Sequence, residues 1–390
     1  MADAWITGIG IASCLGEGAD AHWQALTTGE PRPDTTTFAP FIVHPIAPLE
    51  LDKQIPKRGD QRQMEPWQRI GTYAAGLALD SAGVKGNAEL LGSMDMIVAA
   101  GGGERDVAVD AAILSGLPKA NAPEAFLNER LMNDLRPTLF LAQLSNLLAG
   151  NISIVHGVTG SSRTFMGEEA AGVDAVRIAL ARIQSGQSDI VLVGGAQNAE
   201  RKDQMLIFEF AGLALKERFA PVWERSERPG FALGSLGAFL VIESRTHAEQ
   251  RGAKPMARLA SVVSDRCRRQ PGAIAESLRR LWAKLAPSEA QAAIISGATG
   301  TEPATGEERA FLSEHAGLAV RATGTHLGHG IEPQFAVNIA LAAVALSHEV
   351  LFPPCGAASF EKPMTGPLRQ AVVTSVGHWR GEGMALVEAV

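Results

Sequence analysis

The stretch from Ala170 to Ile183 sets the strongest constraint on the fold. Its small and aliphatic residues recur at helical spacing, and Ala and Gly are so frequent that such a helix must be packed on all sides. Gly186 ends the helix, and Ile190 to Val193 form a short buried strand. Glu168 and Glu169 stand at the start of the helix. Two carboxylates at the mouth of a buried helix need a special reason, so this pair is the first candidate for a functional position.

Strands and helices alternate in both halves of the chain. A strand at Ala4 to Gly8 opens the first half, and the second half begins with a strand at Ala257 to Ser264 and a helix at Ala273 to Leu285. This alternation is typical of an α/β fold with a layered, partly parallel sheet in each half. We therefore expect two α/β halves, residues 1–245 and 246–390.

Two further helices are predicted, at Arg136 to Leu148, with Asn151 to His156 as its continuation or a turn, and at Phe335 to Glu349. The apolar run within the last one, Phe335 to Leu346, is too short to cross a membrane, because a membrane span needs about 20 residues. The N-terminus lacks a basic start followed by an apolar run, so we expect no signal peptide.

The composition is typical of a soluble globular protein. With 46% hydrophobic and 20% charged residues, the chain of 390 residues can form a large core. The net charge of -7 argues against a nucleic acid as the main partner. Cys14, Cys267 and Cys355 lie far apart and form neither a CxxC pair nor a disulfide framework, which favours a reducing cytoplasm.

Two short motifs suggest a dinucleotide site and a metal site, but neither has all the residues that such a site needs. The sequence GIG at residues 8–10 follows a strand, but a dinucleotide fingerprint needs a third Gly where Ser13 stands. His326, His329 and Glu332 are spaced by three, yet two glycines make this stretch a loop and no fourth ligand is evident. Loop hydrogen bonding is favoured over metal binding for these histidines. We therefore expect no cofactor and no metal.

Longer stretches of the chain resemble the β-ketoacyl-acyl carrier protein synthases, in the order and at the spacing of that family. They are WITGIGIASCLGEGADAHWQAL (Trp5 to Leu26), AGNISIVHG (Ala149 to Gly157), the segment ending in DIVLVGGAQ, RPGFALGSLGAFLVIESRTHAEQRGAKP (Arg228 to Pro255), GTHLGHG (Gly324 to Gly330) and VALSHEVLFPP (Val344 to Pro354). The resemblance spans essentially the whole chain. It implies the thiolase-like fold, in which two similar α/β halves form a five-layer αβαβα sandwich, normally as a dimer.

Enzymes of this family condense an acyl thioester with a malonyl thioester and release carbon dioxide. They use a cysteine at the N-terminus of a buried helix, which lowers the pKa of the thiol, two histidines that polarise the malonyl carbonyl, and a lysine. The resemblance places Glu169 at the cysteine position, counted back from Gly186 without a gap. The second histidine is retained as His329.

The other positions of the catalytic set are altered together. The first histidine falls on Gly297 or Ala298 and the lysine on Gly324, so none of these substrate-binding positions carries a reactive group. The flexible gate GFGG of the family corresponds to GHWRG, in which His378 and Trp379 are bulky. Because loss of one member of a concerted set can cost on the order of a million-fold in rate, the combined losses argue against condensation.

The resemblance therefore implies a catalytically inactive, chain-length-factor-like subunit of an active 3-oxoacyl-acyl carrier protein synthase in fatty acid or polyketide-type synthesis. The alternative is a malonyl-carrier decarboxylase, or another acyl-thioester enzyme that uses Glu169 and His329. The expected partners are an acyl carrier protein and a second chain, in a homodimer or a heterodimer, with Asn151 to Thr164 as the dimer segment. A basic cluster from Arg266 to Lys284 is either a solvated face or a docking patch for the acidic carrier protein.

Overall fold

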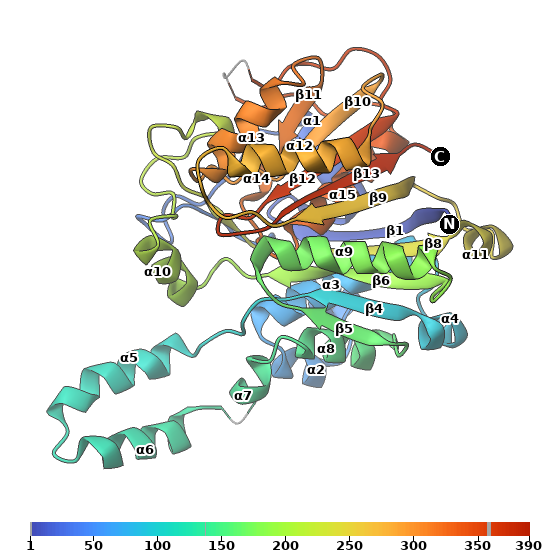
Figure 1. Cartoon of the computed structure of the whole chain (residues 1–390). Helices are drawn as coiled ribbons and strands as arrows, with labels where there is room; N and C mark the ends of the chain where they lie inside the picture. Colours follow the sequence, from blue (N-terminus) through green and yellow to red (C-terminus); the bar gives the residue numbers. More distant parts are fainter. Residues whose placement is uncertain (1, 137, 357–359) are drawn as a thin grey trace.

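The computed structural model describes residues 2–136, 138–356 and 360–390, and its main strands form one continuous sheet whose two halves, called here the first and the second sheet, are built alike (Figure 1). The strands of the first sheet are, in spatial order, β5 (Ser162–Phe165), β4 (Asp95–Ala99), β6 (Ile190–Gln197), β8 (Leu236–Ser244) and β1 (Ala4–Ser13). Those of the second are β11 (Ala319–Ala322), β10 (Ala292–Ser296), β12 (Gln370–Val376), β13 (Glu382–Glu388) and β9 (Ala257–Asp265). The short strands are β2 (Gly16–Glu17), which pairs with β1, and β3 (Val43–His44), which pairs with β7 (Leu233–Gly234).

The order of pairing is the same in both sheets. From the outer edge inward, two parallel pairings are followed by two antiparallel ones, through β5, β4, β6, β8 and β1 in one sheet and through β11, β10, β12, β13 and β9 in the other. The sheets join where Trp5 pairs with Arg258 and Ile6 with Ala257. The division into residues 1–245 and 246–390 stays a proposal; it falls between β8 and β9.

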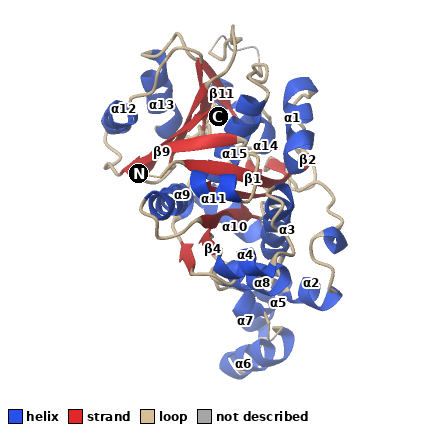
Figure 2. Cartoon of the chain, turned by 90° about the vertical axis from the view of Figure 1, so that its right-hand side faces the viewer, coloured by secondary structure: helices blue, strands red, loops and turns tan. Residues whose placement is uncertain are grey.

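Helices form the remaining layers. The chain contains α1 (Gly18–Thr28), α2 (Arg58–Gln63), α3 (Pro66–Ser81), α4 (Ala88–Ser93), α5 (Val107–Gly116), α6 (Pro123–Asp134), α7 (Leu139–Ala142), α8 (Leu147–His156), α9 (Glu168–Gln184), α10 (Lys202–Phe210), α11 (Arg245–Gln250), α12 (Ala273–Leu285), α13 (Ala304–Ser313), α14 (Gly324–Leu327) and α15 (Gln334–Ser347). Short 3-10 helices span Leu51–Lys53, Leu117–Lys119 and Val222–Glu224. Figure 2 shows α12 and α13 on one side of the strands and α3 on the other.

The central layer consists of α9 and α15, which contact each other and both sheets. α9 packs against β6 and β9, and α15 against β8 and β12, while α3 and α12 cover the outer faces. This arrangement confirms the expected five-layer α/β sandwich. It also explains the small residues of α9, because a Cβ at Gly172 would collide with the carbonyl of Glu332 just before α15.

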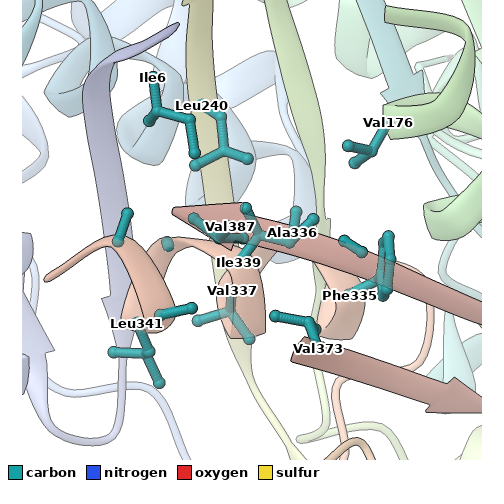
Figure 3. Close-up of a cluster of buried hydrophobic side chains, with 14 of the residues drawn as sticks. Ile6, Val176, Leu240, Phe335, Ala336, Val337, Ile339, Leu341, Val373 and Val387 are labelled. Carbon is teal, nitrogen blue, oxygen red and sulfur yellow. The ribbon is translucent and has the colours of Figure 1, made fainter. Parts of the chain in front are cut away.

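The largest part of the core surrounds α15. Every residue from Gln334 to Leu346 is buried, and Figure 3 shows Val337, Ile339 and Leu341 of this helix among side chains from the strands. A helix that is apolar all round is stable only between two covering layers. None of the described helices has the length and apolarity that a membrane crossing needs.

One predicted helix is wrong and one region was not predicted. Instead of a single helix from Arg136 to Leu148, the structure has the short helix α7, a turn and then α8. The hydroxyl of Ser145 in this turn is 2.6 Å from the carbonyl of Gly101, so a tertiary contact interrupts the helical path. The helices α5 and α6, for which the sequence suggests no assignment, form a hairpin that extends away from the body (Figure 1).

We predict that Arg251→Ala lowers the free energy of unfolding by about 3–5 kcal/mol, because it leaves a buried carboxylate without its main cation. Glu243 on β8 is fully buried, and its carboxylate accepts hydrogen bonds from Thr7 and from Arg251, whose Nε lies 2.7 Å away. Urea unfolding measures the effect. The control is Arg245→Ala, which removes an exposed ion pair of 2.7 Å to Glu249 and should lower the free energy of unfolding far less. Equal costs for the two variants would contradict the prediction.

Candidate functional site

A sharp turn carries Glu169 into the protein interior. After β5 the chain passes through Gly167, with φ of 128°, and α9 begins at Glu168, with φ of 60°. A left-handed φ at a residue other than Gly costs about 1–2 kcal/mol, so the surrounding structure must hold this turn. As a result, Glu169 at the helix N-terminus is only 2% exposed.

The carboxylate of Glu169 is bound by two histidines. Its Oε1 lies 2.7 Å from Nε2 of His329 and 2.8 Å from Nδ1 of His378, and the backbone N–H of His378 is 3.4 Å away. The side chains are 3% exposed for Glu169 and His329 and 5% for His378. Burial opposes ionisation of Glu169, but the hydrogen bonds from His329 and His378 outweigh it and hold the pKa of the carboxyl below its usual range.

His329 is fixed by a backbone bridge to the strand segment around β7. Its N–H donates to the carbonyl of Ala232 at 2.7 Å, and its carbonyl accepts from the N–H of Gly234 at 3.0 Å. The ring also packs against Phe231, with 5.1 Å between ring centroids. These backbone and ring contacts give His329 a defined orientation toward Glu169.

His378 comes from the loop between β12 and β13. The N–H of Gly377 donates to the carbonyl of Gly381 at 2.8 Å, and Arg269 donates to the carbonyl of Gly377 at 2.7 Å while it also pairs with Glu382. Burial lowers the pKa of His378, but its hydrogen bond to Glu169 and the nearby carboxylates raise it more. The loop is thus held closed over Glu169.

Trp379 lies on the outer side of the same loop. Its side chain is 64% exposed, whereas that of His378 points inward. The two bulky residues of the loop therefore differ: the histidine reaches the candidate site, and the tryptophan faces solvent.

Gly297, Ala298 and Gly324 lie together at a second, tightly packed place. A Cβ at Gly297 would come within 2.6 Å of the carbonyl of Thr374, and one at Gly324 within 3.1 Å of the carbonyl of Ala298. Neighbouring backbone therefore occupies the space that larger side chains would need. None of the hydrogen bonds or ion pairs described for this chain joins these three residues to Glu169.

A third carboxylate lies near the site and belongs to Glu332. Burial, and then the charges of Glu169 and Glu168, raise the pKa of this carboxyl to about 7. One oxygen of Glu168 and one of Glu169 are buried without a hydrogen-bond partner. The cluster thus holds more carboxylates than imidazoles. His326, considered with His329 and Glu332 on sequence spacing, points elsewhere and bonds to the backbone of Gly29.

Burial raises the pKa of the thiol at each of the three cysteines. Cys14 contacts Nδ1 of His44 at 3.8 Å, and burial raises the pKa of its thiol to about 12. Burial also raises the pKa of Cys355, to about 11. Neither group forms a thiolate near neutral pH.

The comparisons with known proteins agree with this architecture. The family model of the β-ketoacyl synthase N-terminal domain matches residues 1–248. The 3-oxoacyl-[acyl-carrier-protein] synthase 2 of Vibrio cholerae is 25% identical over 260 residues, which cover 64% of this chain and 59% of that relative. The putative β-ketoacyl synthase 1 for oxytetracycline polyketide from Streptomyces rimosus is 25% identical over 377 residues, covering 89% and 85%. The chain thus spans only about three fifths of the length of the first of these relatives.

Solved structures show the same fold at low sequence identity. The ishigamide ketosynthase/chain length factor superposes with a TM-score of 0.81 at 20% identity and covers 100% of this chain and 99% of that one. A β-ketoacyl synthase from Burkholderia phymatum gives a TM-score of 0.79 at 16% identity, with both chains fully covered. A type II polyketide synthase acyl carrier protein in complex with its ketosynthase gives 0.75 at 18%, again with full coverage.

Proposed function

Since the chain belongs to the β-ketoacyl synthase family, we propose that it is the non-condensing, chain-length-factor-like subunit of a ketosynthase dimer in fatty acid or polyketide-type synthesis. One observation carries the proposal. At the position of the family's nucleophile, the carboxylate of Glu169 is 2% exposed and is bound by His329 and His378. Acyl transfer in this family needs a thiolate as the nucleophile. A buried carboxylate that already accepts two hydrogen bonds cannot take that role.

The surface around β5 supports a dimer. We define the apolar edge surface by its exposed hydrophobic residues, which are Val107, Leu114, Leu131, Met132, Phe140, Leu141, Leu144, Ile154 and Met166. They lie on α5, α6, α7 and α8, in the turn between α7 and α8, and beside β5, and Figure 1 shows these elements at one end of the molecule. Isolated exposed hydrophobics are common, but this many neighbouring ones mark an interaction site.

The occupant we propose for this surface is a second ketosynthase-like chain that carries the cysteine. A homodimer would contain two copies of Glu169 and no nucleophile, whereas a heterodimer with an intact partner would contain one active site. The likeness to a ketosynthase/chain length factor structure supports this choice. We also propose a cytoplasmic setting, because the three cysteines are free thiols.

An acyl carrier protein is the proposed source of substrate, since several relatives are named for acyl carrier protein thioesters. The basic cluster is a weak candidate for its docking site. Arg279 pairs with Glu314 at 2.5 Å and Arg280 with Asp265 at 2.8 Å, and Arg269 is committed to Glu382. Much of the positive charge is therefore balanced within the chain, which favours the interpretation as a solvated face.

We predict that acyl groups label the partner and never this chain. When the reconstituted pair is incubated with an acyl-carrier thioester or with cerulenin, intact mass spectrometry should show an adduct on the cysteine-bearing chain alone. Replacing the partner's nucleophile by Ala should remove all labelling, because no thiol in this chain replaces it. A stable adduct on this chain at the Glu169 site would contradict the proposed function.

A second candidate function is a malonyl-carrier decarboxylase. The specific observation in its favour is that His378 places a second imidazole beside His329, although the family's first histidine is absent from Gly297 and Ala298. Two imidazoles could polarise a malonyl carbonyl. Against it, the ionised Glu169 would repel the malonyl carboxylate, and the closed loop leaves the side chains nearly inaccessible.

A further inference from the structure

Three donor atoms converge at the centre of the candidate site. Oε1 of Glu169, Nε2 of His329 and Nδ1 of His378 all lie within 4.8 Å of one another. Oε1 is 2.7 Å and 2.8 Å from the two nitrogens. Ligand atoms around a tetrahedral zinc ion, at about 2.0–2.2 Å from the metal, are about 3.3 Å apart. Moving Oε1 away from each nitrogen by about 0.5–0.6 Å, with the two nitrogens about 3.3 Å apart, would turn the two hydrogen bonds into metal bonds.

The surroundings hold the three donors in place. Each comes from a different segment, namely the N-terminus of α9, the loop before α15 and the loop between β12 and β13. The ring of His329 packs on Phe231, and that of His378 packs on Phe231 and Phe208 at 5.7 Å. Preorganised ligands in an apolar shell are the usual surroundings of a bound transition metal.

Unused binding capacity at the site points to a cation. Oε2 of Glu169 is buried and has no hydrogen-bond partner. Glu168 and Glu332 add two further carboxyl groups near His378, and Glu332 is 6% exposed. Buried charged groups in proteins are usually paired or coordinate a metal. A divalent cation held by the three donors would also give Oε2 of Glu169 a partner.

We propose that Glu169, His329 and His378 bind one divalent transition-metal ion of the zinc class. Two imidazole nitrogens and one carboxylate oxygen are a donor set that suits zinc and its neighbours. Magnesium and calcium prefer sets of six or more oxygens, so they are disfavoured here. If the proposed function holds, the ion ties the 377–381 loop to α9 and keeps the site closed, but binding itself does not depend on that function.

The test is metal binding by the purified, metal-free full chain. Isothermal titration with zinc chloride should give one ion per chain, zinc should raise the melting temperature by preferential binding to the folded state, and magnesium chloride should do neither. Loss of an outer-shell partner alone costs about 10–100-fold in metal affinity, so Glu169→Gln, His329→Ala and His378→Ala should each weaken zinc binding by more than ~100-fold.

A matched control separates the site from surface histidines. His315 forms a 2.8 Å pair with Glu289, but no third possible metal ligand lies with them among the described residues, so His315→Ala should leave zinc binding unchanged. Circular dichroism identifies any variant that fails to fold, and Glu169→Gln is the nearly isosteric variant on which the conclusion rests if a histidine variant unfolds. Absence of stoichiometric zinc binding by the wild type, or unchanged binding by Glu169→Gln, would overturn the proposal. Neither result would alter the acyl-labelling and pairing tests of the proposed function.

Discussion

The isolated chain should condense an acyl thioester with a malonyl thioester more slowly than an intact ketosynthase by on the order of a million-fold, the scale on which loss of a concerted catalytic set reduces a rate. The physical reason is that Glu169 supplies a carboxylate where a thiolate is required. In addition, the family resemblance assigns an enolate-stabilising imidazole to Gly297 or Ala298 and a lysine to Gly324, and none of these residues carries such a group. The measurement is product formation by the purified chain, with an intact ketosynthase as the positive control.

Glu169→Cys should remain as slow as the wild type. The substitution restores a thiol, but backbone packing around Gly297 and Gly324 still excludes larger side chains. The loop that carries His378 stays anchored by Arg269, so the acyl group has no open path to the thiol. Condensation by Glu169→Cys at a rate near that of an intact ketosynthase would contradict the view that several losses act together.

Carbon dioxide release distinguishes the two candidate functions. With a malonyl-carrier substrate, we expect no release above background from the wild type or from Glu169→Gln, with the active partner absent. In the presence of the partner, both should support equal rates, because Gln keeps the size of Glu169 and can still accept hydrogen bonds from His329 and His378. Clear release by the isolated wild type that Glu169→Gln abolishes would favour the decarboxylase over the inactive subunit.

The sequence predicts those helices and strands whose apolar pattern is set by residues close together in the chain. The helix at Ala273 to Leu285 has the same bounds in the structure as in the sequence analysis, and the strand expected at Ala257 to Ser264 ends one residue later, at Asp265. Both have a regular apolar pattern with clear ends, so neighbours in the chain determine them. α5 and α6 lack such a pattern. α6 contains no buried residue and α5 contains only Ile113, so their apolar side chains do not face a core of this chain.

The sequence predicts only part of the candidate site. Glu169 and His329 occupy positions that the family resemblance identifies, and the structure brings them within hydrogen-bonding distance. The contact of His378 with Glu169 joins residues 209 positions apart. It depends on the path of a loop that Arg269 fixes through the carbonyl of Gly377, and no motif records such a tertiary contact. Glu332 is likewise near the site only because α9 and α15 pack so closely.

Disrupting the apolar edge surface should weaken dimerisation by at least about 100-fold, which corresponds to about 2.7 kcal/mol. Ile154 on α8 is 69% exposed in the single chain, and Ile154→Asp would bury an unpaired charge in the proposed interface. Sedimentation or native mass spectrometry of the chain, alone and with the cysteine-bearing partner, measures the effect. Val350→Asp is the matched control, because Val350 is 54% exposed after α15 and outside this surface.

The edge of the sheet offers a second, independent variant. The carbonyls of Ser161 and Phe165 accept hydrogen bonds from Met96 of β4 and from Ala100 just after it, so by alternation the backbone groups of Thr164 point away from the sheet. Thr164→Pro therefore removes an outward N–H donor without breaking the pairing of β5 with β4, and it should reduce dimerisation if the partner adds a strand at this edge. Thr164→Ala keeps the donor and should leave the dimer intact.

The two variants separate the contributions of side chains and backbone to the interface. Weakening by Ile154→Asp alone would mean that the helices pair through apolar contacts and that the strand edge stays free. Weakening by both variants would mean that the sheet of one chain continues into the sheet of its partner. Such pairing would place the two α9 helices on either side of the same interface, and with them Glu169 and the partner's nucleophile position. A wild-type chain that remains monomeric at micromolar concentration with the partner present, or a dimer that neither variant weakens, would exclude this surface as the dimer interface.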